Sequence, residues 1–117
     1  MRKSLIALIA LSGVAVGVAV AQAGGHTKLT GFLSITGEYA IDPPPDQKID
    51  RVGIHLTGEA AKRVYDAMPA KAENGCDDGM RTKRAGSLSC FSDKGERYGC
   101  MVAVLLASGE TRPFGAC

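Results

Sequence analysis

The chain has 117 residues, with 14 Lys and Arg against 12 Asp and Glu, four Cys and no Trp. Arg2 and Lys3 precede an uncharged segment, so the rest of the chain carries 12 basic and 12 acidic side chains. Nucleic-acid affinity needs a surplus of Lys and Arg facing phosphates, so we expect no nucleic-acid partner. The length allows one domain, and 5% aromatic residues argue against a large enclosed substrate site.

Residues 1–23 have the layout of a bacterial-type secretory signal peptide, with a basic start, an apolar run and small residues at the end. An uncleaved membrane anchor is the alternative, but the run at 5–21 is short for a span and rich in Ala, Val and Gly rather than Leu. We expect cleavage after Ala23, with Ala21 as the second candidate. Residues 24–117 would then form a single periplasmic or secreted domain without stable membrane insertion.

Residues 28–41 alternate between apolar and polar side chains, which predicts a half-buried strand. The face expected to pack on the core carries Leu29, Leu33, Ile35, Tyr39 and Ile41. Gly31 and Gly37 are candidates for β-bulges, and three prolines at 43–45 end the strand in an exposed loop. A second strand is predicted at 52–56, with Val52, Ile54 and Leu56 directed inward and His55 outward.

A helix is predicted from residue 58, with Thr57 as its N-cap and Pro69 as its stop. Ala61, Val64, Tyr65 and Met68 recur at helical spacing and form its apolar face. A polar loop is expected at 70–80.

Residues 87–91 and 98–106 predict a hairpin with Gly95 at its tip. The second run is apolar on both faces, as in a central strand with a helix on one side. A turn at 108–110 precedes a short tail or edge strand at 111–117. The prediction is an α+β domain in which an antiparallel sheet of three to five strands carries one packed helix.

The four cysteines, Cys76, Cys90, Cys100 and Cys117, predict two structural disulfides in an exported chain. Three pairings are open. A turn centred on Gly95 places Cys90 opposite Cys100 on the apolar face, which favours Cys90–Cys100 together with Cys76–Cys117. No C-x-x-C motif is present, so a zinc or thioredoxin-like site is disfavoured.

Cleavage after Ala23 would expose Gly24-Gly25-His26. The free amine, two backbone amides and the imidazole of His26 could enclose Cu(II) or Ni(II) in a square plane. Cleavage after Ala21 would remove this site, and an incidental His in a flexible terminus is the plain alternative. No other cofactor is expected.

Three further features have simple structural explanations. The basic run at 81–84 could contact phosphates or anionic lipid, but a solvated strand end is favoured. The acidic stretch at 76–79 lacks the spaced Asp and Asn residues and the distal Glu of a calcium-binding loop, so we interpret it as a turn. His55 could serve a small secreted hydrolase, but an exposed polar position on a strand is the favoured interpretation.

Two stretches carry a resemblance to known proteins. They are LTGEAAKRVYD at 56–66, and an L-x-C at 88–90 followed by Y-x-C at 98–100. Together they resemble a group of small exported bacterial proteins of uncharacterised function. The resemblance implies a small periplasmic α+β domain and no catalytic residue.

These observations favour a non-enzymatic exported protein that acts by binding another molecule, most simply a protein. The proline loop at 43–45 and the hairpin tip around Gly95 are the segments expected to be free for contacts. Copper or nickel binding and a small hydrolase are the alternatives. The sequence names neither the partner nor the oligomeric state.

An intact-mass measurement of the exported protein, alkylated without reductant, tests the processing and the disulfides together. We expect the mass of residues 24–117, lighter by four hydrogens and free of alkyl groups, because all four cysteines are paired. A mass beginning at Gln22 would exclude the copper site, and alkylated thiols would contradict two disulfides.

Overall fold

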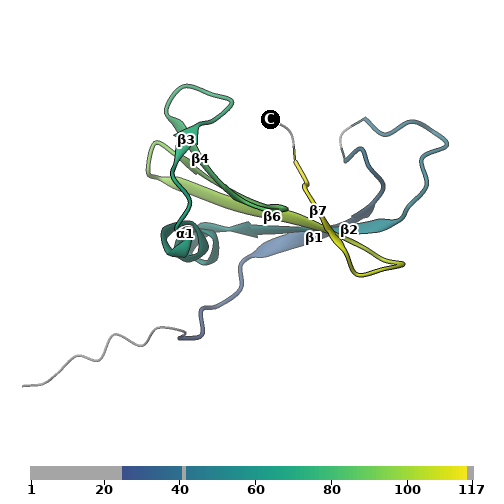
Figure 1. Cartoon of the computed structure of the whole chain (residues 1–117), viewed down its shortest axis with the longest axis horizontal. Coiled ribbons are helices and arrows are strands. Elements are labelled where there is room, and N and C mark those ends of the chain that lie inside the picture. The colour runs from purple at the N-terminus through teal and green to yellow at the C-terminus, as the bar shows by residue number, and fades with distance from the viewer. Residues whose placement is uncertain (1–24, 41, 116–117) are drawn as a thin grey trace, which may run out of the picture.

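The structure is a computed structural model that describes residues 25–40 and 42–115 (Figure 1). The predicted signal peptide at 1–23, Gly24, Ile41 and Cys117 lie outside the described residues. The elements follow in the order β1 (Gly31–Thr36), β2 (Arg51–Thr57), α1 (Gly58–Ala67), β3 (Glu73–Asn74), β4 (Met80–Ala85), β5 (Leu88–Asp93), β6 (Arg97–Leu105) and β7 (Thr111–Arg112).

The strands form one antiparallel sheet in the order β1-β2-β6-β5-β4-β3, with β7 also paired to β6. The α+β architecture with one helix against the sheet is therefore confirmed within the described part of the chain. Over residues 25–40 and 42–115 the sheet has seven strands rather than three to five. Strand β4 has the sequence MRTKRA, which lacks apolar alternation, and β3 and β7 have only two residues each. Strands of this kind form because neighbouring strands supply backbone hydrogen bonds, and their own sequences show little of the pattern that predicts a strand.

Helix α1 follows the prediction closely. Thr57 occupies the N-cap position with an extended backbone, and Met68, the C-cap, leaves the helix just before Pro69. Proline disfavours helical geometry in the residue before it, which accounts for the end point. Glu59 lies in the first turn, where the helix dipole favours a negative charge.

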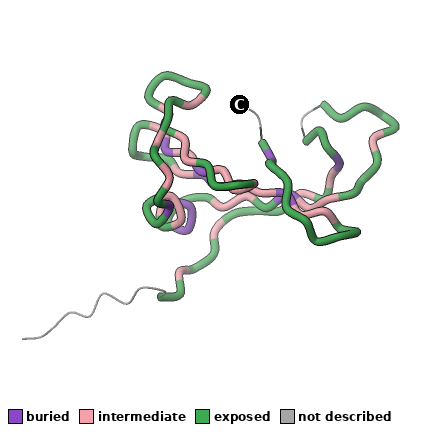
Figure 2. The backbone as a smooth tube through the Cα atoms, in the orientation of Figure 1, coloured by how far each residue is buried: buried purple, intermediate pink, exposed green. Residues whose placement is uncertain are grey.

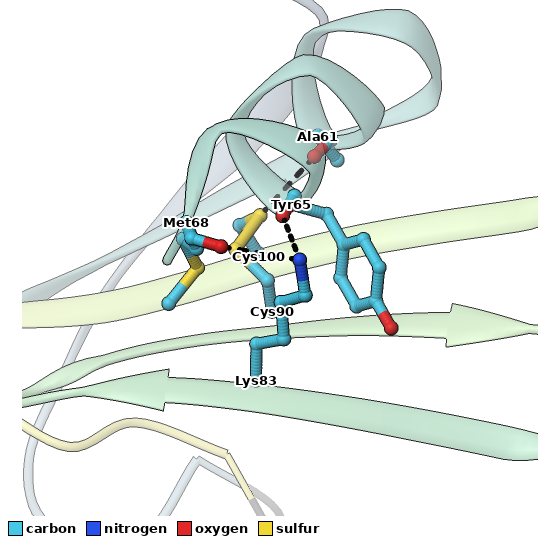
Figure 3. Close-up of a disulfide and its surroundings, with 6 residues drawn as sticks. All are labelled: Ala61, Tyr65, Met68, Lys83, Cys90 and Cys100. Carbon is cyan, nitrogen blue, oxygen red and sulfur yellow. Dashed lines mark hydrogen bonds between the residues drawn. A yellow bond between two sulfur atoms is a disulfide. The ribbon is translucent and has the colours of Figure 1, made fainter. Parts of the chain in front are cut away.

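The helix sits on the disulfide between Cys90 of β5 and Cys100 of β6 (Figure 3). The two cysteines are directly opposite in the β5–β6 register, as predicted from the turn at Gly95. Ala61 has no exposed surface, and its carbonyl oxygen lies 3.5 Å from Sγ of Cys100. Met68, Leu56, Val64, Tyr65, Leu88 and Tyr98 complete this cluster. The small side chain of Ala61 lets the helix approach the sulfur atoms closely.

Lys83 of β4 ties the end of the helix to the sheet (Figure 3). Its Nζ donates hydrogen bonds to the carbonyl oxygens of Tyr65 at 2.9 Å and Met68 at 3.1 Å. The same ammonium lies 4.6 Å from the centre of the Tyr65 ring. The last turn of α1 contains no basic residue, so a lysine from the sheet supplies the positive charge that stabilises a helix C-terminus.

Cys76 is also disulfide-bonded. Because Cys117 lies outside the described residues, the Cys76–Cys117 pairing stays a prediction.

The first predicted strand differs most from expectation. Strand β1 covers only Gly31–Thr36, and Leu29, Leu33, Ile35 and Tyr39 are exposed instead of packed on the core. The prediction that these side chains are buried was wrong, because β1 is an edge strand and no element within 25–40 and 42–115 buries them.

Gly31, a candidate for a β-bulge, forms none, since β1 and β2 pair residue by residue from Gly31 to Thr36. Gly37, the other candidate, lies beyond the end of β1. Gly31 has φ +150°, and a Cβ there would lie 1.9 Å from the carbonyl oxygen of His55. The lack of a side chain at Gly31 therefore lets the backbones of β1 and β2 approach closely.

Burial is concentrated in short stretches rather than in one continuous core (Figure 2). One group lies where α1 meets β5 and β6. A second lies on the other side of the sheet, where Ala103 is fully buried and Phe114 is 5% exposed. In Figure 1 the helix and the segment after β7 lie on opposite sides of the sheet.

Replacing both cysteines in Cys90→Ala/Cys100→Ala should lower the free energy of unfolding by about 3 kcal/mol, because the crosslink no longer restricts the unfolded chain. Urea unfolding of the double variant and the wild-type protein measures the difference. A loss below about 1 kcal/mol would show that the helix does not depend on this crosslink.

Candidate functional site

The strand register divides the side chains of the sheet between two faces. Leu33 lies opposite Ile54, Ile54 opposite Val102, and Leu56 opposite Cys100, which places these residues on the face that carries α1. Residues at the alternate positions, including Phe32, His55 and Met101, lie on the other face.

The helix covers only part of its face. It packs on Leu56, Leu88 and the disulfide, and its ten residues amount to about 15 Å of length. Beyond its reach, Leu33 and Ile35 are 64% and 65% exposed and Ile54 is 37% exposed, while their valine neighbours are half-buried. We call this surface the open apolar face; it consists of Leu33, Ile35, Val52, Ile54, Val102 and Val104.

The open apolar face has no charged member. Arg51 and Arg112 pair in register with Leu105 and Ala103, so they lie on the opposite face. There Arg51 Nε donates to Asp50 Oδ1 at 2.7 Å, and Arg112 donates to Glu110 at 2.9 Å. A contiguous exposed apolar surface is a common feature of protein contact sites. Two features of the sequence pointed to this surface. The alternation of apolar residues at 28–41 is long, and the predicted helix is too short to cover it.

On the opposite face, His55 lies between two aromatic rings. The Phe32 ring stacks on it with a centroid distance of 4.3 Å, and Phe114 meets it edge-on at 4.9 Å. Phe114 reaches this position across Gly53, where a Cβ would lie 2.5 Å from its ring. His55 is therefore partly buried rather than the exposed polar residue that the sequence favoured, because β1 and the C-terminal segment each supply a phenylalanine.

The surroundings of His55 do not resemble a catalytic centre. Burial lowers the pKa of its imidazole, whereas a neighbouring carboxylate would raise it. Among the described residues, no hydroxyl or carboxyl group is hydrogen-bonded to it. The hydrolase alternative stays a prediction.

A small cleft of about 170 Å³ lies beside Phe114, between the C-terminal segment and the end of β4. Its lining includes Met80, Phe91 and Met101, with Arg84 and Thr82 as polar members. This volume falls below the range of typical small-molecule sites.

The basic run at 81–84 does not form a patch, because alternate residues of β4 point to opposite faces. Arg81 donates to the carbonyl oxygen of Ala72 and to Asn74, and Lys83 binds the end of the helix. These two cations therefore serve the fold. The stretch at 76–79 is a turn, as predicted, with a hydrogen bond from Met80 N to Asp77 O and φ +81° at Gly79.

The proposed metal ligands are only partly described. Gly24 lies outside the described residues, while Gly25 and His26 line an open groove beside α1 together with Thr27 and Arg63. The Arg63 guanidinium donates to Thr27 Oγ1 at 2.6 Å, so the segment after His26 contacts the helix. Within 25–40 and 42–115, no three His, Cys, Asp or Glu side chains form a metal-binding group. The copper site stays a prediction.

The two segments expected to be free for contacts are exposed. The prolines at 43–45 lie in the β1–β2 loop, which Gln47 closes through hydrogen bonds to N and O of Tyr39 at 2.7 and 2.9 Å. The hairpin tip turns through Lys94 and Gly95, both with positive φ. Neither segment carries an apolar surface comparable to the open apolar face.

No family model, curated protein or solved structure matches the chain. Across the described ranges, no helix is both long and apolar enough to cross a membrane.

The ring contacts of His55 predict its titration. Burial lowers the pKa from the ordinary 6.5, so the folded protein favours the neutral imidazole. The unfolded chain binds the proton more readily, and stability should therefore decline as the pH falls from about 6.5 towards the folded-state pKa. NMR titration of His55 should give a midpoint below 6.5, and Phe114→Leu should move it upward. A midpoint at or above 6.5 would contradict the burial argument.

Proposed function

We propose that this protein is an exported, non-enzymatic protein that binds another protein through the open apolar face. The observation that carries the proposal is the exposure of Leu33, Ile35 and Ile54 on a part of the sheet that the helix does not cover. Contiguous exposed apolar surface is rare on monomeric proteins and marks sites of association.

The proposed compartment is supported by two features. Residues 1–23 have the layout of a signal peptide, and the Cys90–Cys100 disulfide suits an oxidising environment. A disulfide-stabilised domain can hold an apolar surface open without a large core beneath it, because the crosslink offsets part of the missing burial.

A protein fits this surface better than a small molecule or a nucleic acid. The open apolar face extends across β1, β2 and β6 as a sheet surface, whereas small ligands need a concave site. It has no cationic member that could meet a phosphate. A partner of matching chemistry would present branched aliphatic or aromatic side chains that fill the space beside Ile54.

Crosslinked capture from a cell-envelope extract tests the proposal with a matched pair of variants. Ile54→Thr removes an apolar side chain from the face but keeps a β-branched residue in β2. Ile49→Thr makes the same change at a side chain that is 65% exposed and lies outside the face. We expect the wild-type protein and Ile49→Thr to recover the same partner, and Ile54→Thr to recover about tenfold less.

Thermal unfolding of both variants serves as the folding control. Equal recovery by Ile54→Thr would exclude this face as the binding site. Repeated recovery of no protein at all would contradict the proposed function.

A further inference from the structure

Among the residues that the structure describes, strand β1 leaves one side of its backbone without a partner in the sheet. The described sheet order ends at β1, where β2 is its one neighbour. Thr57 N donates to Thr30 O, and this pair continues the β1–β2 register. Backbone groups alternate between the two sides of a strand, so those of Thr30, Phe32, Ser34 and Thr36 face β2. The N–H and C=O groups of Gly31, Leu33 and Ile35 therefore face the open edge.

Of the two strands at the ends of the described sheet order, β3 is protected and β1 is not. Strand β3 has two residues, and Arg81 donates to the carbonyl oxygen of Ala72 just before it. Strand β1 has six residues, GFLSIT, with no charged side chain and no proline. Shortness, charge and proline are the usual means of preventing edge pairing, so the β1 edge is free to accept another strand.

The sequence around β1 is complementary to itself in one antiparallel register. When two copies are aligned about Leu33, Gly31 of each copy faces Ile35 of the other, and Thr30 faces Thr36. The N–H and C=O groups of Gly31, Leu33 and Ile35, which face the open edge, then meet the same groups of the other copy. Lys28 and Glu38 are exposed and lie beyond the two ends of β1, five residues from Leu33 on either side, so continuing the register sets Lys28 of one copy against Glu38 of the other. No other residue between 28 and 38 is charged.

We infer that a second copy of this chain pairs with the first along the open edge of β1, antiparallel and with the two-fold axis at Leu33. Gly31, Leu33 and Ile35 exchange backbone hydrogen bonds with Ile35, Leu33 and Gly31 of the second copy. Lys28 and Glu38 form one ion pair at each end.

The pairing would join the open apolar faces of the two copies into one surface. Leu33 lies opposite Ile54 within each copy, so the order across the joined sheet becomes Ile54, Leu33, Leu33, Ile54. The inference stands independently of the proposed function, because purified protein alone is enough to test it.

Charge reversal provides the decisive experiment, with the exported protein studied by sedimentation equilibrium over a range of concentrations. The wild-type protein should reach twice the monomer mass. Lys28→Glu and Glu38→Lys should each raise the dimer dissociation constant about tenfold or more, because both ion pairs become repulsive. The double variant K28E/E38K should restore dimerisation.

Lys71→Glu is the matched control, since it makes the same change in net charge at an exposed position away from β1. Leu33→Lys places a charge at the two-fold axis and should abolish the dimer while circular dichroism confirms the fold. A monomer at every concentration would overturn the inference. A dimer that persists in both single variants and in Leu33→Lys would overturn it too, because the contact would then lie elsewhere.

Discussion

The contact between Ala61 and the Cys90–Cys100 disulfide is the constraint on which the rest of the structure depends. It holds the helix at one end of the sheet, where Leu56, Leu88 and Tyr98 surround the sulfur atoms. The disulfide also fixes the β5–β6 register, and in an antiparallel sheet one register determines which face every neighbouring side chain occupies. Lys83 then ties the C-terminal end of the helix to β4.

Because the helix is held there, the sheet is divided into a packed end and an open end. At the packed end, a helix and a crosslink provide stability. At the open end, β1, β2 and β6 present apolar side chains that the helix does not reach. The opposite face is closed differently, by the single ring of Phe114 lying across Gly53. The proposed binding surface and the proposed β1–β1 contact both follow from this unequal cover.

Local patterns predicted the parts of the fold that depend on neighbours in sequence. Thr57 and Pro69 flank α1 as predicted. Pro69 ends the helix because proline disfavours helical geometry in the residue before it, whereas Thr57 takes the N-cap position without a side-chain capping hydrogen bond. The position of Cys90 opposite Cys100 follows from a short turn, whose length sets the register. The strand at 80–85 was predicted only as a solvated strand end at 81–84, because its side chains are mostly polar and cationic. Its pairing with β5 comes from backbone groups that carry no sequence pattern.

The sequence by itself determined the helix, the hairpin, the first disulfide and the alternation of β1, since each rests on short-range geometry or side-chain period. Only the tertiary structure decided what covers each face. Alternation at 28–41 shows that one side of a strand is apolar, but burial depends on whether another element reaches it, and none does at Leu33 and Ile35. The same reason places His55 between two phenylalanines that lie 23 and 59 residues away in the chain.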